Sequence, residues 1–274
     1  IERRLNASPP RPGARYEAVN MGVASFSPLL EYLFLKDLLP RLRGHFVLLS
    51  LDPTDFADDF HYQQGAAWGE GGEPLRVRHD GLLPNYFSRT RQFLEALPGP
   101  PWRDIRVLRY LLYHAARLSH GRWAEARLGR IEYDHHGWTR PGNPRQGPWE
   151  AQLDRTFGHI LRIRDLARRA GMGFALAAHP HGHMAHPQAW CAGRRHLYYE
   201  CGRIYPAPLY SRLMRLCAEK GLACWDLTGE FRRPDAPSLF YGFDGHFTPT
   251  GNEVMAGALE RRLRPLLASL PERP

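Results

Sequence analysis

Asp244 and His246 are the two residues of this sequence best suited to acid–base chemistry. They stand two positions apart in the segment 243–252, just before the predicted closing helix. A carboxylate so close to an imidazole can accept a hydrogen bond from it, which fixes the tautomer and stabilises the imidazolium. A general base in acyl transfer requires this, so we predict His246 as the base and Asp244 as its orienting residue. The same spacing also fits an aspartate that caps a turn beside a surface histidine.

Four histidines follow a predicted strand within a short stretch of chain. They are His179, His181, His183 and His186. A His-x-His pattern can bind a divalent metal, and Asp52 or Asp226 could supply further ligands from other strands. Histidines beside an active site can also contact substrate, and we assign that role to His181. No glycine-rich phosphate loop or dinucleotide fingerprint is present. We therefore predict no nucleotide cofactor. Because Pro180 and Gly182 interrupt the histidine cluster, we also predict no metal, and keep metal-dependent hydrolysis as an alternative.

Alternating strands and helices are predicted to position these side chains. Apolar runs indicate strands at 16–23, 45–51, 174–178 and 222–227. Helical spacing indicates helices that begin at Pro28 and that span 150–170, 208–220 and 252–267, with Gly171 and Gly221 predicted to end the second and third of them. This order predicts an α/β sandwich of three layers with a mainly parallel sheet. Ligands of such sheets bind beyond the carboxyl ends of the strands. Gly22, Thr54 and Asp55 follow strands in this way and join the candidate site.

Four segments resemble conserved blocks of the SGNH/GDSL hydrolase family. They are YEAVNMGVASFSPLLEYLFL, HFVLLSLDPTDFADDF, GLACWDLTGEFR and LFYGFDGHFTPTGNEVMAGAL, in that order along the chain. The resemblance implies a flavodoxin-like fold and a Ser-His-Asp site that cleaves esters. Within it, His246 would take the serine proton and Asp244 would orient His246. The N–H of Gly22 would help to form the oxyanion hole, since donors aimed at the developing oxyanion stabilise the transition state.

The sequence departs from this family at two places. The Gly-Asp-Ser block that carries the nucleophile does not occur, so we expect the first strand and its serine to be missing, as in an N-terminally truncated and inactive fragment. Where the family usually has an asparagine that donates to the oxyanion, this sequence has Thr54, whose hydroxyl donates from a shorter side chain. Ser25 and Ser27 lie near Gly22, but Ser27 before Pro28 fits a helix cap better than a nucleophile. Asp55, Asp58 and Asp59 could hold a cap or contact sugar hydroxyls, but we expect them to form a solvated acidic loop.

Residues 60–148 interrupt the alternation with a segment rich in Gly, Pro, Trp and Arg. We predict a single domain over 1–274 with an insertion or cap at about 60–148, whose helical patches lie at 85–97 and 105–127. The predicted function is a serine esterase or O-deacetylase that acts on acylated carbohydrate or cell-envelope glycan. A non-catalytic glycan-binding or assembly protein on the same fold is the alternative from a different class.

The composition indicates a globular protein and narrows its partners. The net charge is +9, yet only Lys36 and Lys220 are lysines and the arginines are spread along the chain. Without a basic cluster or an aromatic–basic motif, we predict no nucleic-acid partner. No apolar run is long enough for a transmembrane helix. The cysteines form no Cys-x-x-Cys pair, and we expect them to be buried thiols, with a disulfide between two of them as the alternative. They are Cys191, Cys201, Cys217 and Cys224.

Overall fold

The computed structural model describes residues 1–78, 146–194, 199–206, 208–242 and 245–270. The chain divides into two compact units, 1–60 with 135–274 and, between them in sequence, 61–134. The helical patches predicted at 85–97 and 105–127 lie outside the described residues. In the described part of the chain, no helix has the length and apolar character needed to cross a membrane.

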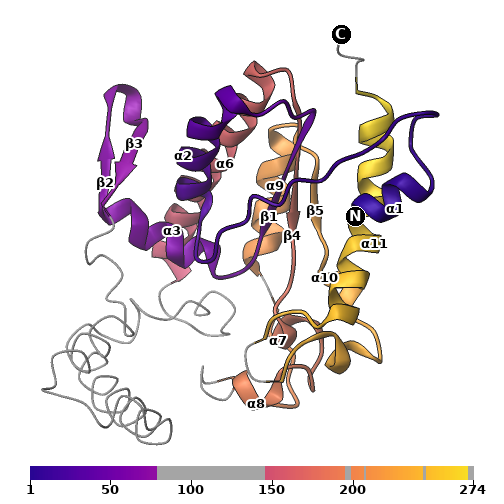
Figure 1. Cartoon of the computed structure of the whole chain (residues 1–274). Coiled ribbons are helices and arrows are strands. Elements are labelled where there is room, and N and C mark those ends of the chain that lie inside the picture. Colours follow the sequence, from indigo (N-terminus) through magenta and orange to yellow (C-terminus); the bar gives the residue numbers. More distant parts are fainter. Residues whose placement is uncertain (79–145, 195–198, 207, 243–244, 271–274) are drawn as a thin grey trace, which may run out of the picture. The chain divides into compact units, whose positions relative to one another are not determined.

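A parallel sheet of three strands forms the centre of the first unit (Figure 1). Its strands are β1 (Phe46–Leu51), β4 (Gly173–Ala178) and β5 (Cys224–Asp226), in the order β1-β4-β5. Leu51 is the partner of Ala178, and Ala178 is the partner of Asp226. The carboxyl ends of the three strands therefore meet at one edge of the sheet.

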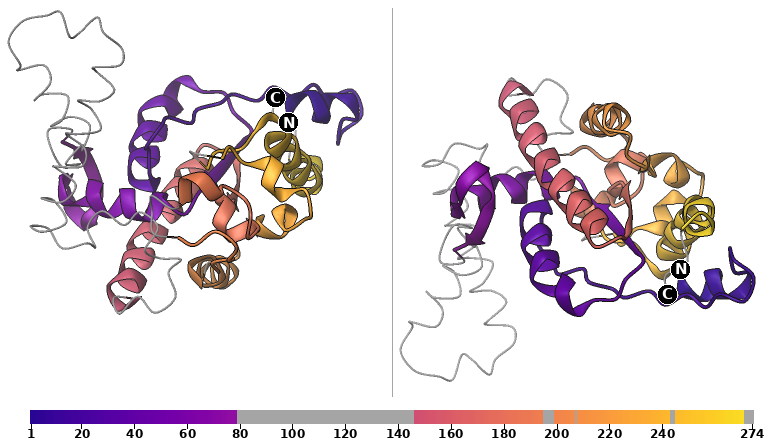
Figure 2. Two further views of the ribbon diagram at one scale, coloured as in Figure 1. Left: turned by 90° about the horizontal axis from the view of Figure 1, so that it is seen from below. Right: turned by 90° about the horizontal axis from the view of Figure 1, so that it is seen from above.

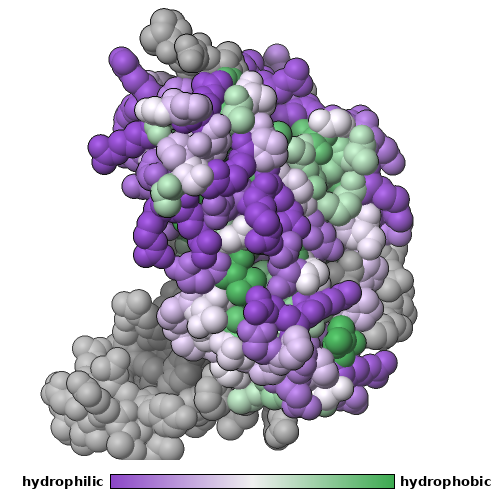
Figure 3. Space-filling view, turned by 90° about the vertical axis from the view of Figure 1, so that its right-hand side faces the viewer, coloured by the Kyte–Doolittle hydropathy of each residue, from purple (hydrophilic) through white to green (hydrophobic). Residues whose placement is uncertain are grey.

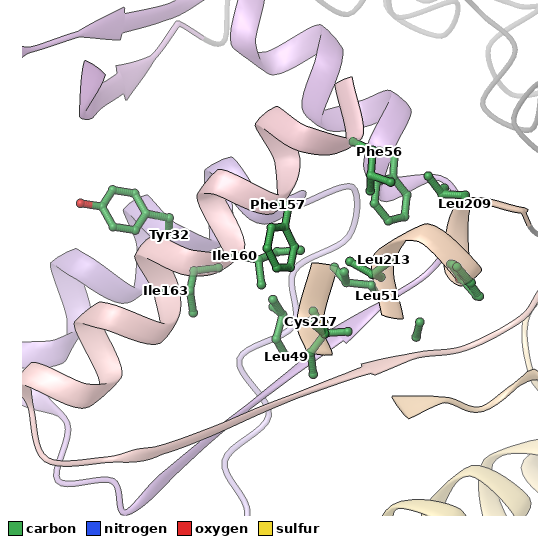
Figure 4. Close-up of a cluster of buried hydrophobic side chains, with 14 of the residues drawn as sticks. Tyr32, Leu49, Leu51, Phe56, Phe157, Ile160, Ile163, Leu209, Leu213 and Cys217 are labelled. Carbon is green, nitrogen blue, oxygen red and sulfur yellow. The ribbon is translucent and has the colours of Figure 1, made fainter. Parts of the chain in front are cut away.

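Helices cover both faces of this sheet (Figures 1 and 2). One face carries α2 (Pro28–Leu38), α6 (Gln146–Arg169) and α9 (Pro208–Glu219), whose apolar side chains pack against β1 and β4. Figure 4 shows Phe157 and Ile160 of α6 close to Leu49 and Leu51 of β1. The mixed α/β class with a mainly parallel sheet is thus confirmed.

The opposite face is covered by α1 (Glu2–Ala7), α10 (Thr228–Phe231) and α11 (Pro249–Ala268). Phe46 and Leu48 pack on this side, while Leu49 and Leu51 pack on the other, because successive side chains of a strand point to opposite faces. The outer surface of α1 and α11 is mainly hydrophilic (Figure 3). Ion pairs lie along it: Arg4–Glu253, Arg262–Glu230 and Arg264–Glu260.

Shorter elements complete the described chain. In the first unit they are η1 (Leu39–Arg41), α7 (Gly182–Ala185), α8 (Cys191–Arg194) and η5 (Ala236–Leu239). The helix α3 (Asp55–Gln64) begins in the first unit. In the second unit, β2 (Ala66–Trp68) and β3 (Pro74–Val77) pair antiparallel, with η2 (Glu70–Gly72) in their connection.

The predicted helix ends at Gly171 and Gly221 are confirmed. Both glycines have a positive φ, 69° and 61°. The residue after each glycine donates its N–H back into the helix, Met172 to the Ala167 carbonyl and Leu222 to the Cys217 carbonyl. This left-handed glycine ending stops a helix and turns the chain toward the next strand.

The strand predicted at 16–23 is wrong. Its backbone groups bond to side chains of the first helix instead of to a neighbouring strand: Tyr16 exchanges two hydrogen bonds of 2.8 Å with the Asn6 amide, and Ala18 N–H donates to Glu2. Val19 is 65% exposed, which a buried strand would not allow. The apolar pattern indicated an extended segment but could not show that no strand pairs with it.

The prediction of free thiols is also wrong, because the cysteines form disulfides. Cys217–Cys224 joins the end of α9 to the start of β5 across the Gly221 turn. Cys191–Cys201 closes a loop around Arg194, whose guanidinium donates to the carbonyls of His186, Ala189, Glu200 and Arg203. Both bonds bridge local turns and need no Cys-x-x-Cys spacing.

Asp59 links three helices below the carboxyl edge. Its Oδ1 accepts from the Ser27 hydroxyl at 3.0 Å and from the Leu29 N–H at 2.8 Å, which caps α2. Its Oδ2 accepts from the Thr156 hydroxyl of α6 at 2.8 Å. Asp59 and Asp58 are buried, so the expectation of a solvated acidic loop at 55–59 is wrong. The sequence around Asp59 forms α3, and this carboxylate fixes the start of α2 against α6.

Replacing Asp59 by alanine tests this linkage. The change leaves the donors of Ser27, Leu29 and Thr156 unpaired in the interior, so we expect the free energy of unfolding to fall by about 3 kcal/mol. Urea unfolding followed by circular dichroism measures this. Asp37→Ala, at an exposed position of α2, is the control and should change stability by less than about 0.5 kcal/mol. Equal stabilities of the two variants would contradict the role given to Asp59.

Candidate functional site

The candidate site is the carboxyl edge of the sheet. His179 directly follows β4, and its N–H donates to the carbonyl of Leu51, the last residue of β1, at 2.9 Å. The N–H of Leu227, after β5, donates to the Ala178 carbonyl at 2.8 Å. Asp52 and His179 thus emerge side by side from paired strands, which is where ligands of parallel sheets bind.

Asp52 is held as an anion by its neighbours. Its Oδ1 accepts hydrogen bonds from the N–H and the hydroxyl of Thr54, at 2.6 and 2.5 Å, and lies 3.8 Å from Nε2 of His181. Burial acts to raise the pKa of Asp52. The contact and charge of His181, with His179 and Thr54, outweigh burial and hold that pKa well below its ordinary value.

Thr54 and Asp55 are occupied in building the turn that leads into α3. The Thr54 carbonyl accepts from the N–H groups of Ala57 and Asp58, and its hydroxyl donates to Asp52. Asp55 accepts the N–H of Asp52 at 2.8 Å. Burial, followed by the charges of Asp52 and Glu31, raises the pKa of Asp55 well above its ordinary value. Its predicted contact with substrate remains a prediction.

His179 is a rigidly placed, neutral imidazole. Its carbonyl accepts from the Tyr210 hydroxyl at 2.7 Å, and its ring centroid lies 5.3 Å from that of Phe247. Burial lowers the pKa of His179 to about 4, against the opposing charge of Asp52 and with the charges of His181 and His246. The charges of Asp52 and His246 therefore both act on the pKa of His179.

The other histidines of the cluster have separate surroundings. His183 is buried and stacks on Tyr199 at a centroid distance of 4.3 Å. His181 meets the edge of Trp190 at 5.9 Å, and Nδ1 of His186 accepts the Gln188 N–H at 3.1 Å. Within the described residues, no group of three or more His, Cys, Asp or Glu side chains is placed to hold a metal ion.

His246 lies on an anchored turn before α11. The carbonyl of His246 accepts the Tyr241 N–H at 2.8 Å, and a bridge joins Phe240 to Phe247. Phe247 stacks on Phe231 with centroids 4.6 Å apart and also contacts His179. This aromatic anchor holds the turn, so the exposed His246 is presented beside the carboxyl edge. Asp244 lies outside the described residues, and its orienting role stays a prediction.

Gly22 and Ser27 lie on the segment that leads into α2. Gly22 is exposed, and its N–H donates to Oδ1 of Asn20 at 3.0 Å. An oxyanion role for Gly22 remains a prediction, and it requires this bond to open. The buried Ser27 donates its hydroxyl to Asp59, which agrees with the predicted helix cap rather than with a nucleophile.

Two residues of this edge, Asp52 and His179, are absent from the site residues that the sequence predicts. Asp52 and His179 each directly follow a strand, which was the available signal. Their mutual contact depends on the register of β1 with β4, and the shift in each pKa depends on burial. The sequence alone shows neither.

Comparison with known proteins found no match among protein-family models, curated proteins or solved structures.

Glu31, in the first turn of α2, supplies a pH test of this acidic region. Burial, followed by the charges of Asp59 and Asp52, raises the pKa of Glu31 to about 8. The folded protein therefore keeps a proton that the unfolded chain releases near pH 4.5. Stability should fall as pH rises from about 5 to 8.

Glu31→Gln mimics the protonated acid and should remove part of this loss. We expect the variant to gain on the order of 3 kcal/mol over the parent at pH 8 and to match it near pH 4. Urea unfolding across this range measures both. Glu17→Gln, at an exposed position, should follow the parent throughout. A parallel pH dependence of the Glu31 variant and the parent would refute the raised pKa.

Proposed function

We propose that this protein is an ester hydrolase that removes an O-acyl group from a carbohydrate, with His246 as its general base. The observation that carries the proposal is the anchored turn of His246 beside His179 and Asp52. An accessible imidazole on a fixed turn, at the ligand-binding edge of a parallel sheet, is what proton transfer to and from a bound substrate requires.

The proposed reaction uses His246 twice. It first takes the proton of a nucleophilic hydroxyl, whose oxygen attacks the acyl carbon. It then gives that proton to the departing sugar alcohol as the ester bond breaks, and water releases the acyl group by the reverse sequence. We assign the hydroxyl to the serine of the Gly-Asp-Ser block, as the family resemblance implies, and the orienting role to Asp244.

The disulfides favour a substrate of the cell envelope. Cys191–Cys201 and Cys217–Cys224 would persist in an oxidising compartment, such as the bacterial periplasm or the cell surface. Acylated envelope glycans are found there, and this agreement supports a glycan ester over a cytoplasmic metabolite.

A glycan-binding or assembly protein without catalysis is the second candidate, and a specific observation favours it. The hydroxyl of Thr54 donates to Asp52, and the N–H of Gly22 donates to Asn20. Both predicted oxyanion donors are therefore engaged, whereas efficient catalysis needs donors already aimed at the oxyanion. Metal-dependent hydrolysis has less support, since the described histidines and carboxylates form no ligand group.

Hydrolysis of p-nitrophenyl acetate by the complete open reading frame tests the proposal. We expect turnover, and we expect His246→Ala to lower kcat/KM by at least about a thousandfold, since the base acts in both steps. His186→Ala is the matched control and should keep the parent rate. Unchanged turnover in the His246 variant would exclude it as the base. A complete protein without turnover that retains glycan binding would support the second candidate.

A further inference from the structure

Nδ1 of His179 is a buried polar atom without a hydrogen bond among the described residues. Such an atom costs free energy, because it has given up water and gained no partner. At the ligand-binding edge of a sheet, an unmet hydrogen bond of this kind marks a position where a bound molecule would be stabilised.

The surroundings of His179 keep this atom in place. The backbone is held on both sides, by the Leu51 carbonyl at 2.9 Å and by the Tyr210 hydroxyl at 2.7 Å. The ring packs against Phe247 at 5.3 Å. Phe247 is next to His246 in sequence, so His179 lies beside the turn that presents the proposed base.

The charge state of His179 limits what it can bind. Burial lowers its pKa to about 4, so the ring is neutral at physiological pH and offers one donor and one acceptor. Asp52 is the adjacent charged group and is held as an anion. A second anion placed here would be repelled by Asp52 and would find no cationic His179.

We propose that His179 is a substrate-contacting residue whose Nδ1 hydrogen-bonds an uncharged oxygen, either a sugar hydroxyl or an ester carbonyl. The identification of that oxygen with the acyl-carbohydrate substrate rests on the proposed function. The site then selects neutral glycan esters over ligands that carry a carboxylate at this position.

Nitrogen NMR of the complete protein, labelled with ¹⁵N-histidine, tests this contact directly. Methyl β-D-glucopyranoside offers hydroxyls, triacetin offers ester carbonyls, and methyl β-D-glucuronide adds a carboxylate. We expect at least one neutral probe to shift the Nδ1 resonance of His179, and which one does so identifies the oxygen. The glucuronide should bind more weakly than its neutral counterpart. Failure of both neutral probes to shift this resonance overturns the proposal.

Two substitutions separate hydrogen bonding from packing. His179→Phe keeps the ring and its contact with Phe247 but has no nitrogen, and it should weaken binding of the effective probe about tenfold. His179→Asn places an amide near the Nδ1 position and should restore most of that affinity. His186→Asn is the control and should bind as the parent does. Parent-like binding by His179→Phe would overturn the assignment.

The outcome is independent of the test of His246. His246→Ala should lose hydrolysis yet still shift His179 with the neutral probe. A parent protein that binds this probe through His179 but hydrolyses no ester would retain the present inference and refute the proposed function.

Discussion

The parallel pairing of β1 with β4 is the constraint on which the rest of the site depends. In this register Leu51 lies opposite Ala178, so the next residues, Asp52 and His179, leave the sheet together. The hydrogen bond from His179 to the Leu51 carbonyl continues the ladder by one step beyond the strands. A shift of this register by one residue would move the apolar side chains of β1 to the wrong faces of the sheet. It would also separate Asp52 from His179. The packing of α6 and α11 on opposite faces therefore also stabilises the site.

The pKa values of the acidic groups near this edge are shifted in opposite directions by their local surroundings. Asp52 receives two donors from Thr54 and faces His181, and its pKa is lowered. Asp55 and Glu31 are buried close to the charge of Asp52, and burial together with neighbouring carboxylate charges raises the pKa of each. One fixed negative charge beside a neutral His179 gives an edge suited to polar, uncharged ligands. In the proposed function, proton transfer is assigned to the exposed His246.

The sequence predicted much of this framework because periodicity and helix ends are local signals. The strands expected at 45–51 and 174–178 are β1 and β4, and glycines end α6 and α9 as expected. The failures have nonlocal causes. The segment 16–23 is extended, but it bonds to Asn6 and Glu2 side chains. The cysteines form disulfides across turns, and their spacing in the sequence did not show that these turns bring them together.

In the candidate site, too, local features could be predicted from the sequence and contacts between distant residues could not. His246 could be singled out from its spacing to Asp244 and its place before a helix. The charge state of His179 could not be predicted, because it depends on burial and on the charge of Asp52, which is distant in sequence. Thr54 was expected to face a ligand, but its hydroxyl donates to a neighbour two residues away. Residue type and strand position located this edge, whereas the direction of each hydrogen bond required the structure.

A histidine NMR titration compares the parent with Asp52→Asn and His246→Ala and tests this arrangement most directly. We expect a pKa of about 4 for His179 in the parent, against an ordinary value of 6.5. Removing the Asp52 charge should lower that pKa further, and removing His246 should raise it, because their charges act on His179 in opposite directions. A His179 that titrates at its ordinary value, and that responds to neither substitution, would contradict the placement of these residues at one edge.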